Sequence, residues 1–112
     1  MMQMKFKKRA STDYIYVVKK QLKGASLATL FKQARRAGEF DTGYHYLLHN
    51  TGEIEVDRAP ADTVAQYNFP DNTVSLYILA DCYNGKLSDA QRLILADIVK
   101  QYPNAEVKEV PV

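Results

Sequence analysis

Two histidines and one cysteine are the side chains of this chain best suited to metal binding or nucleophilic chemistry: His45, His49 and Cys82. The two histidines are four residues apart in a stretch that predicts a β-strand. They would face the same way but lie about 13 Å apart, at about 3.3 Å per residue. Two ligands of one zinc ion need their nitrogens much closer together. Asp81 and Cys82 could join one histidine only through the tertiary fold, so we expect no zinc site on these residues.

Cys82 and His45 could in principle act as a nucleophile and its general base. Nothing in the sequence fixes their distance or supplies a third group to orient the histidine. A lone thiol mostly behaves as a small hydrophobic side chain. We therefore expect Cys82 to be an inert thiol and His45 to make a hydrogen bond in the packed interior. His49 is expected at an exposed turn.

The two histidines belong to a predicted β-hairpin. Residues 43–48 indicate a buried strand, and residues 53–56 indicate the returning strand. Gly52 supplies the positive-φ position that such a turn needs. Residues 58–72, rich in Pro, Asp and Asn, predict a long irregular connection with at most one short helical turn, and connections of this length often carry function.

The rest of the chain alternates predicted strands with predicted helices. Residues 14–18 and 73–80 are continuous apolar runs, which is typical of strands covered on both faces, and residues 105–110 predict an edge strand. Residues 19–24 predict a basic loop. Ser26 and Gly38 are predicted to cap the first helix, and Ser88 opens the second with capping-box spacing. The first helix is predicted to have an apolar side and a basic side. The apolar side consists of Leu27, Leu30, Phe31 and Ala34. The basic side consists of Lys32, Arg35 and Arg36.

This alternation predicts an α/β fold. We expect a single domain over residues 1–112, with a central mixed β-sheet of about five strands flanked by two or three helices. The 112 residues are 46% hydrophobic, which suits a globular domain. No apolar run reaches the roughly 18 residues that span a bilayer. The start of the chain lacks the pattern of a secretory signal, and a lone cysteine suits a reducing compartment, so we expect a cytoplasmic protein.

Charge is divided unevenly along the chain. Residues 1–38 hold ten Lys or Arg and one Asp, whereas residues 39–112 hold five Lys or Arg and twelve Asp or Glu. Such polarity indicates either a face for an acidic partner or two halves that attract one another in the fold. The basic residues have no interleaved aromatic motif, so we do not expect a nucleic-acid partner.

Four segments of the chain carry a resemblance to one known family. They are the stretch at 5–17, the hairpin at 43–54 with its Gly-Tyr-His-Tyr start, the strand at 72–76 and the helix start at 87–91. In this order they resemble the zinc N-acetylmuramoyl-L-alanine amidases, whose hairpin reads G-Y-H-F and then D-G-x-I. The likeness is closest to the small phage lysozymes that cut the lactyl–peptide amide of peptidoglycan. The resemblance implies the amidase and peptidoglycan-recognition fold, and a bacterial, phage or prophage origin.

The resemblance also implies that the zinc ligands of the family are missing. The first histidine of the family matches Val18, and the second falls in the stretch matched by residues 109–111. The third ligand would follow Val112, and a histidine of the long connection is replaced near Gln66. Because a valine side chain cannot donate to a metal, we expect no zinc cofactor. Tyr44 matches the tyrosine beside the zinc-bound water of the family.

The basic residues after the first strand are expected to border the groove where the metal of the family would lie. The predicted groove for a ligand or partner consists of Val18, Lys19, Lys20, Lys23, Tyr44, Gln66 and Tyr67. Tyr44 and His45 are expected to be remnants of the family's site without a catalytic role. Lys32, Arg35 and Arg36 would extend the basic region.

Three functions follow as hypotheses. The first is a catalytically inactive amidase-like protein that acts by binding a protein partner in a regulatory or inhibitory role, because phage lysozymes of this type bind and inhibit an RNA polymerase. The second is a peptidoglycan- or muropeptide-binding module, or a residual amidase of cell-wall turnover. The third is a hydrolase with other catalytic residues, for which the sequence offers no nucleophile set.

Overall fold

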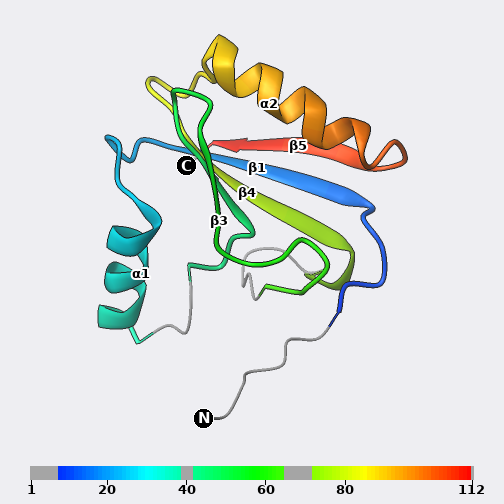
Figure 1. Ribbon diagram of the computed structural model, residues 1–112, viewed down its shortest axis with the longest axis horizontal. Helices are drawn as coiled ribbons and strands as arrows, with labels where there is room; N and C mark the ends of the chain where they lie inside the picture. The colour runs from blue at the N-terminus through cyan, green and yellow to red at the C-terminus, as the bar shows by residue number, and fades with distance from the viewer. Residues whose placement is uncertain (1–7, 39–41, 65–71, 112) are drawn as a thin grey trace.

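One five-stranded mixed sheet organises the chain (Figure 1). The structure is a computed structural model that describes residues 8–38, 42–64 and 72–111. The strands are β1 (Tyr14–Lys20), β2 (Tyr46–Leu48), β3 (Ile54–Val56), β4 (Ser75–Asp81) and β5 (Glu106–Pro111). Their order in the sheet is β3-β2-β4-β1-β5, and the β2–β3 pair is antiparallel while the other pairs are parallel. The predicted fold class is confirmed.

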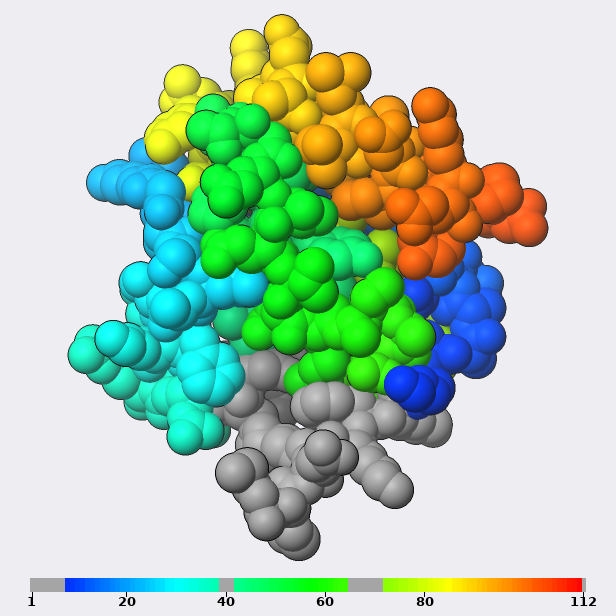
Figure 2. All heavy atoms as spheres, viewed as in Figure 1, coloured from blue at the N-terminus to red at the C-terminus, as the bar shows by residue number. Residues whose placement is uncertain are grey.

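Two helices cover opposite faces of this sheet. Helix α1 (Leu27–Arg36) follows β1, helix α2 (Asp89–Lys100) follows β4, and a short 3₁₀ helix (Asn72–Val74) precedes β4. In the space-filling view, the β2–β3 hairpin lies between the atoms of α1 and those of α2 (Figure 2). No helix in the described ranges is long and apolar enough to cross a membrane.

The face of the sheet under α2, called the α2 face below, holds the main core. Alternate residues of the two central strands point to it, and Leu95 and Ile98 of α2 cover them. These strand residues are Ile15, Val17, Leu76, Ile78 and Ala80. All seven residues of β4 are buried. A central strand covered on both faces loses its alternation of polar and apolar residues, as the sequence predicted for this run.

The opposite face, called the α1 face below, holds two smaller apolar clusters. Val18, Leu47 and Leu79 form one of them, together with Leu27 and Leu30 from the region of α1. The other cluster consists of Tyr16, Val64 and Tyr77, with partly buried neighbours. Tyr44 and Val110 pack against both clusters and so join them.

The predicted helix ends are confirmed. Ser26 accepts a hydrogen bond from the backbone N–H of Thr29 at 3.3 Å, and Gly38 has the positive φ of 81° that ends α1. Ser88 and Gln91 form the complete capping box of α2. Phe31 departs from the prediction that it belongs to the apolar side of α1, because it is 39% exposed.

The predicted basic loop after the first strand is wrong at its start. Lys19 and Lys20 are the last residues of β1, because the pairing of β1 with β4 continues to Lys20 and Asp81. The ammonium of Lys19 lies 3.3 Å from the carboxylate of Glu109 on β5, which offsets the cost of a lysine in this position. The hairpin strands are shorter than predicted, since β2 begins at Tyr46.

Candidate functional site

His45, at the start of the predicted hairpin, has a structural role, because both of its ring nitrogens bond to backbone groups. It is fully buried, and its Nδ1 accepts a hydrogen bond from the backbone N–H of Tyr77 at 3.0 Å. Its Nε2 therefore carries the proton and donates to the carbonyl of Asp62 at 2.6 Å. Burial lowers the pKa of His45 to about 4, so the ring is neutral at pH 7. Both ring nitrogens are engaged with backbone groups and cannot bind a metal, which confirms the predicted interior hydrogen bond.

His49 pairs with a glutamate instead of lying free at the turn. Its Nε2 is 2.6 Å from the Glu55 carboxylate, and the same carboxylate oxygen accepts a hydrogen bond from the backbone N–H of Leu27 at 3.3 Å. Leu27 is the first residue of α1, so this contact links the hairpin to the start of that helix. The predicted exposed histidine is in fact half-buried and serves the attachment of α1.

Cys82 lies on the other side of the sheet from His45. The thiol belongs to the core of the α2 face, while the ring of His45 stacks on Tyr77 of the α1 face with centroids 6.1 Å apart. Burial raises the pKa of the Cys82 thiol, which keeps it protonated at neutral pH. The two residues cannot act as a nucleophile and its base, and Cys82 is buried as predicted.

Asp81 fixes the connection between β1 and α1. Its buried carboxylate accepts hydrogen bonds from the backbone N–H groups of Leu22 and Gly24, both at 2.8 Å. Asp81 is the register partner of Lys20, the last residue of β1. The connection between β1 and α1 is thereby tied to the end of β4. This places Leu22 beside the sheet.

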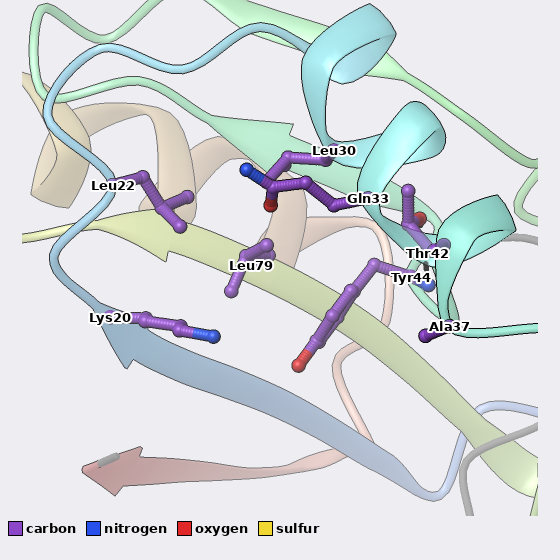
Figure 3. A pocket seen from close by; sticks show the side chains of 9 residues that line it. Lys20, Leu22, Leu30, Gln33, Ala37, Thr42, Tyr44 and Leu79 are labelled. Atoms are coloured by element: carbon purple, nitrogen blue, oxygen red, sulfur yellow. Dashed lines mark hydrogen bonds between the residues drawn. The ribbon is translucent and has the colours of Figure 1, made fainter. Parts of the chain in front are cut away.

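A pocket of about 230 Å³ lies between α1 and the end of β1 (Figure 3). Its apolar lining consists of Leu22, Leu30, Ala34, Ala37 and Leu79, and its polar lining consists of Lys20, Gln33, Thr42 and Tyr44. In the close-up view, the Lys20 ammonium and the Tyr44 hydroxyl point toward the same space (Figure 3). The pocket can hold a small ligand with an apolar group and an anionic or hydrogen-bonding group.

The predicted groove residues divide between several places. Lys20 and Tyr44 line the pocket, and Val18 lies beneath it with Leu79 in one apolar cluster. Lys19 is a correction, because strand alternation turns it to the α2 face, where it pairs with Glu109. Lys23 is exposed in the turn after β1, away from the pocket lining.

Two further predicted groove residues, Gln66 and Tyr67, lie outside the described residues. Five further lining residues were not predicted from the sequence: Leu22, Gln33, Ala37, Thr42 and Leu79. Leu30 and Ala34 carried a signal, since they lie on the predicted apolar side of α1. The others come from separate segments that share no local pattern.

Val18, which the resemblance matches to the first zinc ligand of the amidases, lies beside the stretch 109–111 that it matches to the second. Val18 on β1 is the register partner of Val110 on β5, and the two residues pack into the same cluster on the α1 face. Val18 is only 3% exposed. Neither side chain has an electron pair to donate to a metal. Within the described ranges, no group of three or more His, Cys, Asp or Glu side chains is placed to hold a metal ion. These residues do not fit a catalytic zinc ion.

Comparison by sequence gives little. No family model matches the chain. One curated protein, the 5′-nucleotidase SurE of Xylella fastidiosa, is 33% identical over 48 residues, which are 43% of this chain and 18% of that protein. The chain thus spans less than a fifth of the length of this relative, and so short a match does not show a family.

Comparison by structure identifies the fold. PGRP-Hd from Alvinella pompejana is similar with a TM-score of 0.75 and 18% identity, over 96% of this chain and 76% of that one. The Ph2119 endolysin from the Thermus scotoductus bacteriophage has a TM-score of 0.72 and 21% identity, over 93% of this chain and 75% of that one. The N-acetylmuramoyl-L-alanine amidase LysC from Clostridium intestinale has a TM-score of 0.72 and 14% identity, over 88% and 69%. The chain has the fold of N-acetylmuramoyl-L-alanine amidases and PGRPs.

Proposed function

We propose that this protein uses the amidase fold to bind a peptidoglycan fragment and does not hydrolyse it. The observation that carries the proposal is the pair Val18 and Val110, which pack side by side. The resemblance matches Val18 to the first zinc-binding histidine, and Val110 belongs to the stretch 109–111 that it matches to the second. A zinc amidase needs three protein ligands and an open position for the attacking water. Val18 and Val110 have hydrocarbon side chains, and the carboxylate of Glu109 is paired with Lys19, so these residues offer no means to hold the metal or to activate that water.

The remaining reactive side chains supply no substitute for the metal. Both nitrogens of His45 bind backbone groups, and Cys82 is buried on the α2 face. Tyr44 stays in the pocket wall, where a hydroxyl can orient a ligand but has no activated nucleophile to assist. This arrangement supports binding over catalysis.

The pocket on the α1 face supports a peptidoglycan fragment as the ligand. Several solved structures with this fold are peptidoglycan recognition proteins or endolysins by name. The mixture of leucine and alanine side chains with Lys20, Gln33, Thr42 and Tyr44 suits a short peptide with small side chains and carboxylates. Peptidoglycan stem peptides have this chemistry.

A protein partner in a regulatory or inhibitory role is the second candidate. Lys32, Arg35 and Arg36 are exposed on α1, on the side away from the sheet. A cluster of exposed cations on one helix attracts an acidic protein face and accelerates association at low salt. The resemblance to phage lysozymes that bind an RNA polymerase favours the same idea.

Zinc content and cleavage test the loss of hydrolysis. The purified protein is dialysed against zinc, then against metal-free buffer, and its metal is measured beside a zinc amidase of the same fold. We expect no retained zinc and no release of stem peptide from peptidoglycan. About one zinc per chain, together with cleavage, would refute the proposal.

Sedimentation with insoluble peptidoglycan tests the ligand. We expect the wild-type protein to sediment with the polymer, and a variant with Leu79→Arg in the pocket to stay in solution. A K32E/R35E/R36E variant is the matched control, because it changes α1 outside the pocket lining. Retention that depends on these three charges and not on Leu79 would favour the protein-partner candidate. No retention of the wild-type protein would discard the peptidoglycan proposal.

A further inference from the structure

We infer that Lys20 is the ligand-anchoring residue of the pocket and that it binds a carboxylate of the stem peptide. The inference rests on the proposed function and names the group of the ligand that this chain recognises. Lys20 is the last residue of β1, two positions after Val18 on the same face of the sheet. A lysine cation in this chain therefore lies close to the place where the resemblance puts a zinc cation.

The geometry places the ammonium of Lys20 in the pocket. Because residues of a strand alternate between faces, Lys19 turns to the α2 face and pairs with Glu109, whereas Lys20 lines the pocket on the α1 face. Lys20 is exposed, and its side chain extends toward the Tyr44 hydroxyl (Figure 3). A ligand carboxylate in this space could accept a hydrogen bond from the Lys20 ammonium.

The charge of Lys20 is available to a ligand. The ion pairs of the described residues join Lys8 to Asp62, Lys19 to Glu109 and His49 to Glu55, and none of them includes Lys20. Its register partner Asp81 uses its carboxylate on two backbone N–H groups of the loop after β1. The Asp81 carboxylate is thus engaged by the loop and does not pair with Lys20, whose ammonium remains at the pocket.

The rest of the lining narrows the ligand class. Leu22, Leu30, Ala34 and Leu79 offer an apolar surface for a methyl-sized side chain, and the volume of about 230 Å³ is small for a complete disaccharide peptide. An apolar ligand group over Lys20 would displace the water molecules that solvate the ammonium and would offer no hydrogen-bond acceptor in their place. This desolvation would cost binding free energy. An alanine-containing peptide with a carboxylate satisfies both parts of the lining.

The test compares a free acid with its amide. The probes are N-acetylmuramoyl-L-alanyl-D-glutamate and the same compound with both glutamate carboxyl groups converted to amides, titrated by calorimetry at low salt. We expect the wild-type protein to bind the acid about tenfold more tightly than the diamide, since hydrogen bonds to charged groups are the stronger ones. Lys20→Met should remove this preference by weakening the acid alone, and Lys20→Arg should restore most of it.

Lys100→Met is the matched control for Lys20→Met. Lys100→Met makes the same change of charge at an exposed position at the end of α2, and should bind both probes as the wild-type protein does. Unchanged melting of Lys20→Met confirms that it is folded. Equal wild-type affinity for acid and diamide would overturn the role of Lys20 but leave the proposed function standing. Failure to bind either probe would overturn both.

Discussion

The two faces of the sheet differ in how completely they are closed. On the α2 face, a continuous apolar cluster runs from the central strands to Leu95 and Ile98 of the helix. On the α1 face, the apolar residues form two smaller clusters, and a pocket separates α1 from the end of β1. Helix α1 stands to one side of the sheet, whereas α2 runs along it (Figure 1).

The α2 face contributes mainly to the stability of the fold, whereas the α1 face also contains the candidate binding site. Every residue that the resemblance relates to amidase chemistry and that the structure describes, namely Val18, Tyr44, His45 and Val110, lies on or beside the α1 face. The core of the α2 face is hydrocarbon apart from the Cys82 thiol and one buried amide, Gln91, whose side chain is fully hydrogen-bonded. Changes on the α2 face should therefore act on folding alone, whereas changes at the pocket on the α1 face should also act on the ligand.

The largest contrast is expected between two neighbouring residues of β4. Ile78 is fully buried on the α2 face, and Leu79 lies 4% exposed on the α1 face beside the pocket. Ile78→Ala should lower the free energy of unfolding by about 4 kcal/mol, and Leu79→Ala by about 2 kcal/mol, because the open side adjusts more easily. Urea denaturation measures both. A larger loss for Leu79→Ala would mean that the two faces do not differ as described.

The next effect is the pH dependence that His45 gives to folding. Its pKa is lowered to about 4 by burial, whereas an exposed histidine has a pKa near 6.5. The unfolded state thus binds a proton that the folded state does not bind until the pH is much lower. The contribution of His45 is complete above pH 6.5 and is lost as the pH falls toward 4, by about 3 kcal/mol in total.

Thermal unfolding at a series of pH values checks this prediction. His45→Asn removes the titrating ring, and should flatten the slope of stability between pH 6.5 and 4 although the variant is less stable throughout. An unchanged slope in His45→Asn would assign the pH dependence to other groups.

Much of the fold could be predicted because local signals agreed with the tertiary structure. The apolar runs at 14–18 and 73–80 are the two central strands, and Ser26, Gly38 and Ser88 mark the helix ends where predicted. The basic pair Lys19 and Lys20 was misassigned to a loop. Two adjacent lysines disfavour a strand by themselves, and the pairing with β4 and the contact with Glu109 that stabilise them depend on residues far away in the sequence.

The pocket could not be predicted in the same way. Its residues come from the end of β1, the loop after it, α1, the start of the hairpin segment and β4. Each has an ordinary local explanation, and Gln33 or Thr42 alone indicates nothing. Only the register of β1 against β4 and the position of α1 bring them together. The apolar character of positions 18 and 110 was visible in the sequence, but their pairing required the structure.

A smaller effect is expected from the loop that borders the pocket. Asp81→Asn keeps the shape of the side chain but turns one acceptor into a donor, so the N–H of Leu22 or of Gly24 loses its partner. The expected loss is about 2 kcal/mol of unfolding free energy, with weaker ligand binding because Leu22 lines the pocket. Amide hydrogen exchange at Leu22 and Gly24 should increase in the variant. Exchange that stays slow would show that other contacts hold this loop.

The smallest effect tests whether the α1 face still has the geometry of a metal site. Val18 and Val110 are register partners on adjacent parallel strands, so histidines at both positions would have backbones about 4.8 Å apart. Two imidazoles at that spacing can reach one zinc ion at about 2.1 Å.

Zinc at ten times the dissociation constant should then stabilise V18H/V110H by about 1.4 kcal/mol, measured as a rise in melting temperature that a chelator reverses. The single variants V18H and V110H should each show a much smaller rise, and the wild-type protein none. A chelator-sensitive rise in the wild-type protein would mean that donors outside this valine pair hold zinc, which would contradict the expected absence of retained zinc.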